Sequence, residues 1–493
     1  MGVIKRQTIK GSVYSYLGVA IGLIYTILAI KLLTPAQIGL FALLGAYSAM
    51  YSQFATLGFS RVIERLFPYF SDRAHKHNGF LFLTVAVGMA GFAISLIIFF
   101  IIKPWVIESN QADWPLFVHY IWYLIPLIFF RMFSVMLDTY NKMLFDSTTG
   151  SILTDFVNRL GTLSLLGAFF FKWINFSQFV LGFVFFLSLP AIYLTGLLIY
   201  RRQFNLQPKL EFITPPLRKE IISLSAFGMI GGLSAVALKQ IDTIMLGAYT
   251  DEATAGIYSI LFFFTTVILI PSIALGKISS TIIANAWKNK DMPTIADIYF
   301  KSSINQLFFS LLLFILVVTN LHNIIHLLGP DYAGTEWVIV LISLSSLIVS
   351  STGSSVQILG TSHKYKIQTY SVGVLVILSV IFYIIFIPRL GILGAALGSL
   401  LSLAGASLLR IIYLKREMDL FPYRRVHLKC LAIGLVAFAI GRFIPVTDNL
   451  YIDLILRGSA VSAAFISLSY LFHITDEMNQ IMDKVYKRIR KNR

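Results

Sequence analysis

Long apolar runs follow one another along almost the whole chain, and short polar stretches separate them. A helix needs about 20 apolar residues to cross the hydrocarbon core of a bilayer. Runs of about this length fall at roughly 12–33, 37–60, 79–102, 115–137, 150–171, 177–200, 220–247, 253–275, 300–320, 335–358, 367–387, 391–414, 428–445 and 452–473. The pattern therefore predicts an all-α polytopic membrane protein with about fourteen transmembrane helices.

The seventh run combines small residues with two charges along one helix face. Spacings of three and four residues place them in a single stripe. The stripe consists of Ser225, Gly228, Gly232, Ala235, Lys239 and Asp242. Each charge costs about 2.5–3.5 kcal/mol to hold in lipid. We therefore expect Lys239 and Asp242 to face a cavity or each other; the alternative is a neutralised pair that only packs helices.

A short motif after the first run is echoed after the seventh. LLTPAQIGLFAL (32–43) and LGAYTDEATAGIYSI (246–260) each lead through a turn to a glycine, an aliphatic residue and an aromatic residue. The echo predicts two tandem halves of six spans, related by an axis along the membrane normal. The expected domains are two six-helix lobes and two extra helices, followed by a basic tail that lies against anionic headgroups. Their bounds are 1–205, 206–415, 416–475 and 476–493.

Composition and charge support a membrane protein. Of the 493 residues, 57% are hydrophobic, whereas soluble domains are about 45–50% apolar. The net charge of +17 reflects topology, because 30 of the 40 Lys and Arg residues fall on one side of the predicted spans and positive loops are cytoplasmic. We therefore expect a multi-pass protein of the cell (inner) membrane with both termini cytoplasmic, and no nucleic-acid partner. The first run is too long for a cleaved signal peptide, so we expect it to be retained.

The first half also carries charges inside its predicted spans. Arg131 lies in the fourth span, and Asp155, Asn158 and Arg159 lie in the fifth. The other members of this group end the second span and are Arg61, Glu64 and Arg65. The group has more arginines than acids, and the planar guanidinium suits phosphate oxygens. We predict that Arg131, Arg159, Arg61 and Arg65, with Lys239, bind an anionic substrate.

Simpler interpretations of these residues stay open. Arg61 and Arg65 could be positive-inside anchors, and Asp155 with Arg159 could form a self-contained i,i+4 pair. Arg131 has no acidic residue in its own span, so it is the strongest candidate. The residues Asp155, Asp242, Glu64 and Asn158 could instead line the cavity or bind a coupling Na⁺ or H⁺.

The sequence contains no catalytic motif and calls for no cofactor. His322 and His326 are four residues apart but have no third ligand nearby, so no metal site is expected. The single cysteine, Cys430, excludes an intramolecular disulfide. Gly18-x3-Gly22 and Gly391-x2-Gly394-x3-Gly398 are typical of close helix packing rather than of nucleotide loops.

Four motifs together resemble the polysaccharide-exporting flippases of the multidrug/oligosaccharidyl-lipid/polysaccharide exporter superfamily. They are LLTPAQIGLFAL after the first span, LGFSRVIERLFPYF at the end of the second, IDTIMLGAYTDEATAGIY around the seventh and IPRLGILGAALGS leading into the twelfth. The resemblance implies two six-helix lobes forming a V around a central cavity. It also implies flipping of a polyprenyl-pyrophosphate-linked oligosaccharide to the outer leaflet by alternating access, for cell-surface polysaccharide export. Its partners would be the bilayer, a polysaccharide polymerase and glycosyltransferases.

Two other functions remain as alternatives. A cation-coupled drug or organic-cation extruder of the same superfamily would need buried carboxylates to attract its substrate, whereas the first half has an excess of arginines. A membrane glycosyltransferase or polymerase would need a sizeable surface domain, and the loops are too short for one. We therefore expect a transporter rather than an enzyme.

Overall fold

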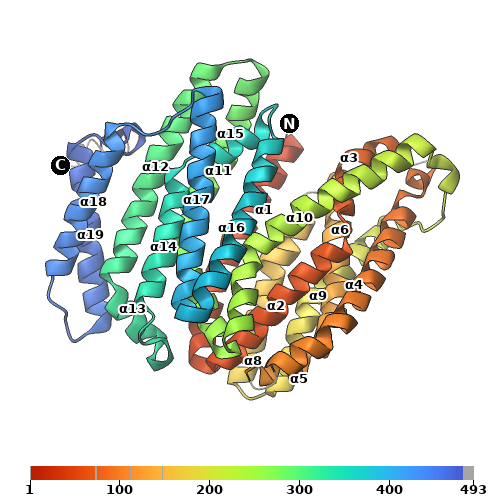
Figure 1. The fold of residues 1–493 in the computed structure, drawn as a ribbon, viewed down its shortest axis with the longest axis horizontal. Helices are drawn as coiled ribbons and strands as arrows, with labels where there is room; N and C mark the ends of the chain where they lie inside the picture. The colour runs from red at the N-terminus through yellow and green to blue at the C-terminus, as the bar shows by residue number, and fades with distance from the viewer. Residues whose placement is uncertain (1, 73–74, 111–112, 147, 481–482, 484–493) are drawn as a thin grey trace. The chain divides into compact units, whose positions relative to one another are not determined.

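The computed structural model describes residues 2–72, 75–110, 113–146, 148–480 and 483, and these residues form helices and turns without a strand (Figure 1). Within them, 11 helices are long and apolar enough to cross a membrane, or 12 if one bent pair is a single span. This confirms the all-α polytopic fold, while the predicted count of fourteen is approximate. Most of the predicted basic tail 476–493 lies outside the described residues.

Two of the predicted spans are not among these helices. The first of them lies within α1 (Gly2–Leu32), a helix of 31 residues that includes the apolar stretch Leu17–Leu32. The predicted span 150–171 is divided among α7 (Thr149–Ser151), the π-helical turn η3 (Ile152–Val157) and α8 (Asn158–Phe170). Such π turns interrupt an α-helix locally, and an apolar pattern alone does not report them.

The chain divides into two compact units, Met1–Gly256 and Ile257–Arg493. The division by packing falls after α10, whereas the lobes predicted by counting spans divide at residue 205; the predicted lobes stay a prediction. The first unit holds the helices already named and several others. These are α2 (Pro35–Ala55), α3 (Phe59–Phe70), η1 (Lys76–Gly79), α4 (Phe80–Asn110), α5 (Pro115–Tyr120), η2 (Ile121–Tyr123), α6 (Leu124–Met143), α9 (Phe176–Tyr200), η4 (Leu210–Phe212) and α10 (Pro215–Tyr249).

The predicted second span is two helices. Thr34 caps α2 in a capping box with Gln37, and the helix ends before Leu57 and Gly58, which have left-handed backbone angles (φ 46° and 69°). The following helix α3 is amphipathic, because Val62 and its apolar neighbours are buried while the charged residues face outward. The break turns the charged end of the predicted span into the exposed face of a separate helix.

The small-residue stripe of α10 packs against the break between α2 and α3. A side chain at Gly228 would collide with Gly58 O, and one at Gly232 would collide with the Gln53 amide. Small residues let helix backbones approach closely in membranes. The part of the stripe that contains Gly228 and Gly232 is therefore a helix-packing face, and this packing accounts for its small residues.

The two echoed motifs meet in a reciprocal contact. A Cβ at Gly39 would collide with Glu252 O, and a Cβ at Gly256 would collide with Pro35 O. Pro35 and Glu252 each precede the glycine of their own motif by four residues, so each motif meets the other at the equivalent position. Each motif also begins with a side-chain cap, since Thr34 Oγ1 accepts from Gln37 N and Asp251 Oδ1 accepts from Thr254 N. This pairwise equivalence supports an internal repeat.

The second unit begins in α11 (Glu252–Lys288), which crosses the boundary between the units. It continues with α12 (Met292–Thr319), α13 (Leu321–Leu328), η5 (Pro330–Tyr332), α14 (Glu336–Ser351), α15 (Ser355–Thr361), α16 (Lys366–Leu390), α17 (Ile392–Met418), α18 (Arg425–Phe443) and α19 (Leu450–Leu471). The predicted tenth span is the bent pair α14 and α15, which meet at 51°. The last two helices, α18 and α19, pack on α12 through an apolar cluster that includes Phe308, Cys430 and Phe465.

Candidate functional site

Arg131 lies on α6 and reaches across to α2. Its Nη1 donates to Gly45 O and to Ser48 Oγ, both at 3.2 Å. A carbonyl and a hydroxyl are neutral acceptors, and within the described part of the chain Arg131 forms no ion pair. The side chain is half-buried. Its positive charge is therefore hydrogen-bonded but not neutralised, which leaves it able to attract an anion.

Arg159, at the start of α8, faces α1. Its Nη1 donates to Gly18 O at 2.8 Å, and a Cβ at Gly22 would lie 2.9 Å from the same nitrogen. A Cβ at Gly18 would collide with Asp155 O. Both glycines of the predicted Gly18-x3-Gly22 motif thus allow α1 to approach the helix that carries Arg159, as the sequence predicted.

The neighbouring polar residues of the fifth predicted span serve packing at least in part. Asn158 is buried, and in the amide orientation that satisfies its neighbours its nitrogen donates to Phe186 O on α9 at 2.7 Å. Asp155 is half-buried in η3, where its carboxylate lies 3.5 Å from Thr154 Oγ1. Asn158 therefore links α8 to α9.

Arg61, Glu64 and Arg65 lie together on the exposed face of α3. Arg61 Nη1 and Glu64 Oε2 form an ion pair at 3.2 Å, and these side chains are 55% and 50% exposed. An exposed pair of this kind adds little stability. Its exposure fits a contact with headgroups or with the polar part of a substrate equally well.

Lys239 and Asp242 have different surroundings on α10. Lys239 is exposed, whereas Asp242 is buried and its Oδ1 accepts a hydrogen bond from Thr243 N at 2.7 Å. Arg131 and Arg159 likewise contact different helices, α2 and α1. The structure therefore places the predicted residues on adjoining helices of the first unit, and their joint role in binding stays a prediction.

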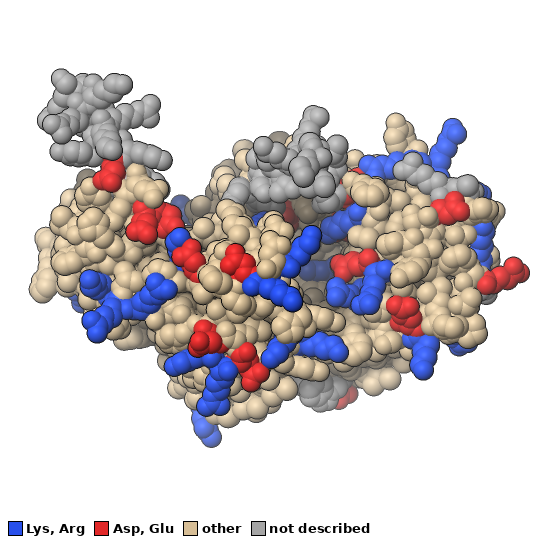
Figure 2. All heavy atoms as spheres, turned by 90° about the horizontal axis from the view of Figure 1, so that it is seen from above, with Lys and Arg blue, Asp and Glu red and all other residues tan. Residues whose placement is uncertain are grey.

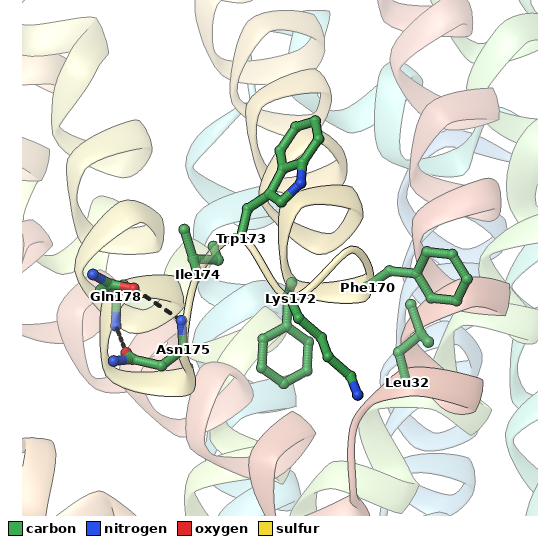
Figure 3. A pocket seen from close by; sticks show the side chains of 8 residues that line it. Leu32, Phe170, Lys172, Trp173, Ile174, Asn175 and Gln178 are labelled. Atoms are coloured by element: carbon green, nitrogen blue, oxygen red, sulfur yellow. Dashed lines mark hydrogen bonds between the residues drawn. The ribbon is translucent and has the colours of Figure 1, made fainter.

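Surface charge does not by itself mark a site. Figure 2 shows Lys and Arg side chains with Asp and Glu side chains among them on the face that it presents. A hollow elsewhere lies at the turn between α8 and α9, as Figure 3 shows. Lys172, Phe170 and Trp173 line it, and Trp173 is 77% exposed. Aromatic and basic residues at the end of an apolar helix are typical membrane-interface anchors, so we expect this hollow to lie at the bilayer surface.

Among the described residues, four buried charged side chains were not singled out from the sequence, namely Asp146, Glu252, Asp453 and Arg410. Glu252 receives the backbone N–H groups of Leu116 (3.3 Å) and Phe117 (3.1 Å), so it caps the start of α5. Asp453, on α19, pairs with Arg457, a residue that the sequence shows inside an apolar run. Arg410, on α17, is buried as well. For Arg410 the signal was available, since it is a basic residue within the predicted span 391–414.

Comparisons with known proteins agree with this architecture. A profile of the family described as "Polysaccharide biosynthesis protein" matches residues 5–283, more than half of the chain. The probable flippase AglR of Haloferax volcanii is 22% identical over 302 residues, which cover 56% of this chain and 60% of AglR. The aligned region thus spans less than two thirds of this relative.

Solved structures show a similar fold. The lipid II flippase MurJ in its inward closed conformation superposes with a TM-score of 0.76 at 14% identity, covering 94% of this chain and 99% of MurJ. An inward-facing multidrug resistance MATE family transporter of the MOP superfamily superposes with a TM-score of 0.61 at 10% identity, covering 81% of this chain and 94% of the transporter. At these identities the likeness concerns the fold.

Proposed function

The chain belongs to the polysaccharide biosynthesis protein family, and on that premise we propose that it flips a lipid-linked oligosaccharide across the membrane. The substrate is a polyprenyl-pyrophosphate oligosaccharide that moves from the cytoplasmic to the outer leaflet by alternating access. The observation that carries the proposal is Arg131, whose charge is met by neutral acceptors and by no carboxylate among the described residues. A pyrophosphate supplies the negative charge that this guanidinium lacks, and its oxygens suit the planar fork.

The other predicted residues take supporting roles in this proposal. Arg159 contacts the substrate from α8, while Arg61, Arg65 and Lys239 attract the anionic headgroup from exposed positions. Asn158, Asp155 and Glu64 shape the polar surface near them. With the cell interior negative, outward movement of negative charge is favoured by about 2.3 kcal/mol per charge per 100 mV, so the potential can drive export. Coupling to Na⁺ or H⁺ through Asp242 is the alternative.

The cellular setting belongs to the same proposal. The excess of basic residues on one side of the spans supports an inner-membrane protein with cytoplasmic termini. Glycosyltransferases that build the lipid-linked oligosaccharide and a polymerase that consumes it are the expected partners. The two lobes 1–205 and 206–415 are the bodies that would move during alternating access.

A second candidate function is extrusion of organic cations. The likeness to a MATE family transporter favours it, but a cation would meet Arg131 and Arg159 as like charges. A glycosyltransferase is the remaining alternative, and the known proteins named above as similar are a flippase and transporters.

Proteoliposomes with purified full-length protein separate these functions. Each preparation receives a fluorescent polyprenyl-pyrophosphate oligosaccharide, ethidium, or a sugar nucleotide with an acceptor lipid. We expect transbilayer movement of the lipid-linked oligosaccharide, without ethidium transport or sugar transfer. Ethidium accumulation without lipid movement would favour the extruder, and sugar transfer would favour the enzyme. Repeating the assay without Na⁺ and at clamped pH separates ion coupling from the potential.

A further inference from the structure

Arg410 is an unusual charged residue in the interior of the second unit. It lies on α17 two turns before the helix ends at Met418, and it is 6% exposed. Its Nη2 donates to Ser407 Oγ on the same helix at 3.1 Å. Its Nε is buried without a hydrogen-bond partner, and among the described residues Arg410 forms no ion pair. A buried cation is thus left with a single neutral acceptor.

Arg457 shows what a fully satisfied buried arginine looks like in the same unit. It is 4% exposed, and its Nε and Nη2 donate to the Asp453 carboxylate at 3.2 and 3.1 Å. Its Nη1 donates to Gly441 O at 2.6 Å. The Asp453 carboxylate also accepts from Asn323 Nδ2 and from Thr447 N. These contacts explain Arg457 as a structural group, whereas the contacts of Arg410 leave most of its donors unused.

A second unsatisfied donor belongs to the same region. Tyr299, on α12, is 1% exposed and its hydroxyl has no hydrogen-bond partner among the described residues. Leu414, which follows Arg410 by one helical turn, belongs to the apolar cluster that contains Tyr299. The last turns of α17 and the first turns of α12 therefore bring a guanidinium and a phenol hydroxyl into one low-dielectric region.

This combination of groups calls for an anion. Burying a cation that no carboxylate among the described residues neutralises is costly. A guanidinium, a phenol hydroxyl and a serine hydroxyl can all donate hydrogen bonds to one acceptor-rich ligand. We propose that Arg410, with Tyr299 and Ser407, binds a phosphoryl anion inside the second unit. The site is separate from Arg131 and does not depend on the proposed function.

The test measures anion binding to the full-length protein in detergent, in gluconate buffer free of phosphate. Sodium phosphate or pyrophosphate is added at matched ionic strength, and the apparent Tm is compared for wild type, Arg410→Met and Arg425→Met. Arg425 is an exposed basic residue at the start of α18 and serves as the control. We expect saturating anion to raise the Tm of wild type and Arg425→Met by about 2–4 °C, and to leave Arg410→Met unchanged. An equal rise in all three proteins would overturn the proposal.

Two further measurements keep the proposal testable if Arg410→Met does not fold. Tyr299→Phe keeps the ring but removes the hydroxyl, so we expect it to weaken anion binding several-fold. Equilibrium dialysis of wild type with ³²P-phosphate should give a saturable stoichiometry near one phosphate per chain. No saturable phosphate binding, together with no response to the lipid described next, would contradict the site.

A second series with a phospholipid distinguishes a free phosphate from a lipid headgroup as the source of the phosphoryl group. Short-chain phosphatidylglycerol replaces the inorganic anion in the same series, with phosphatidylcholine as the control lipid. A rise in Tm with phosphate alone assigns the site to a free anion. A rise only with phosphatidylglycerol, lost in Arg410→Met, assigns it to a lipid headgroup. A response in Arg410→Met equal to that in wild type would contradict the proposal for both sources.

Discussion

Three arginines in this protein differ in what meets their positive charge. Arg457 is paired with a carboxylate, Arg131 is held by a carbonyl and a hydroxyl, and Arg410 has one hydroxyl. The difference matters because removing one partner of a buried ion pair leaves a charge stranded, while removing a charge held by neutral groups does not. The consequences of substitution should therefore differ sharply among the three arginines.

Asp453→Ala should destabilise the protein by about 3–5 kcal/mol, because it strands the buried Arg457 guanidinium. The expected readout is a large fall in the apparent unfolding midpoint in detergent. The double variant Asp453→Leu with Arg457→Met removes both charges and should recover most of this loss. A midpoint for Asp453→Ala equal to that of wild type would show that the pair is not a structural element.

Arg131→Ala should leave the protein folded. It removes two hydrogen bonds to neutral acceptors and strands no charge, so the loss of stability should be smaller than for Asp453→Ala. The measurement is the unfolding midpoint of both variants at matched expression, with Arg131→Lys as the charge-preserving control. A fall in the unfolding midpoint of Arg131→Ala as large as that of Asp453→Ala would assign Arg131 a structural role.

At the scale of elements, the reciprocal contact of α2 and α11 constrains two glycines. Gly39→Ala and Gly256→Ala should each destabilise the protein by at least about 1–3 kcal/mol, because the added methyl meets a backbone carbonyl that cannot move aside. Gly167→Ala on α8 is the matched control, since a methyl there meets nothing within 4 Å. Alanine at Gly167 should stabilise by about 0.5–1 kcal/mol. Equal unfolding midpoints for all three variants would contradict the close contact between α2 and α11.

Elements were predictable where the signal is local. Apolar length predicted most spans, and the glycines of the two echoed motifs meet in the structure, while the tandem repeat itself stays a prediction. Breaks within spans were missed, because the left-handed turn at Gly58 and the π turn η3 follow from packing rather than from hydropathy. The partners of Arg131 lie 83 and 86 residues away in sequence, so no spacing rule could identify them. Of this part of the candidate site, the sequence could predict only that Arg131 places a charge inside a span.

For the whole molecule, the predicted topology rests on the distribution of basic residues. Cysteines at Lys209 and Asp331, in a Cys430→Ala background, should label from opposite sides of the membrane. We expect Lys209→Cys to be cytoplasmic and Asp331→Cys to be external. The measurement is labelling by an impermeant maleimide in intact spheroplasts and after permeabilisation. Labelling of both positions in intact spheroplasts would break the predicted topology.

The central claim is that the whole molecule moves a lipid-linked oligosaccharide with Arg131 at its pyrophosphate. Its most direct test is the flipping rate of a fluorescent polyprenyl-pyrophosphate oligosaccharide in proteoliposomes, read by dithionite quenching. Wild type should expose the inner-leaflet probe, and Arg131→Ala should be at least about tenfold slower, because a charge-assisted hydrogen bond contributes about 1.5–3 kcal/mol and 1.4 kcal/mol is tenfold. Arg131→Lys should fall between them. A wild-type rate equal to that of empty liposomes would contradict the account, and a wild-type rate in Arg131→Ala would remove Arg131 from the site.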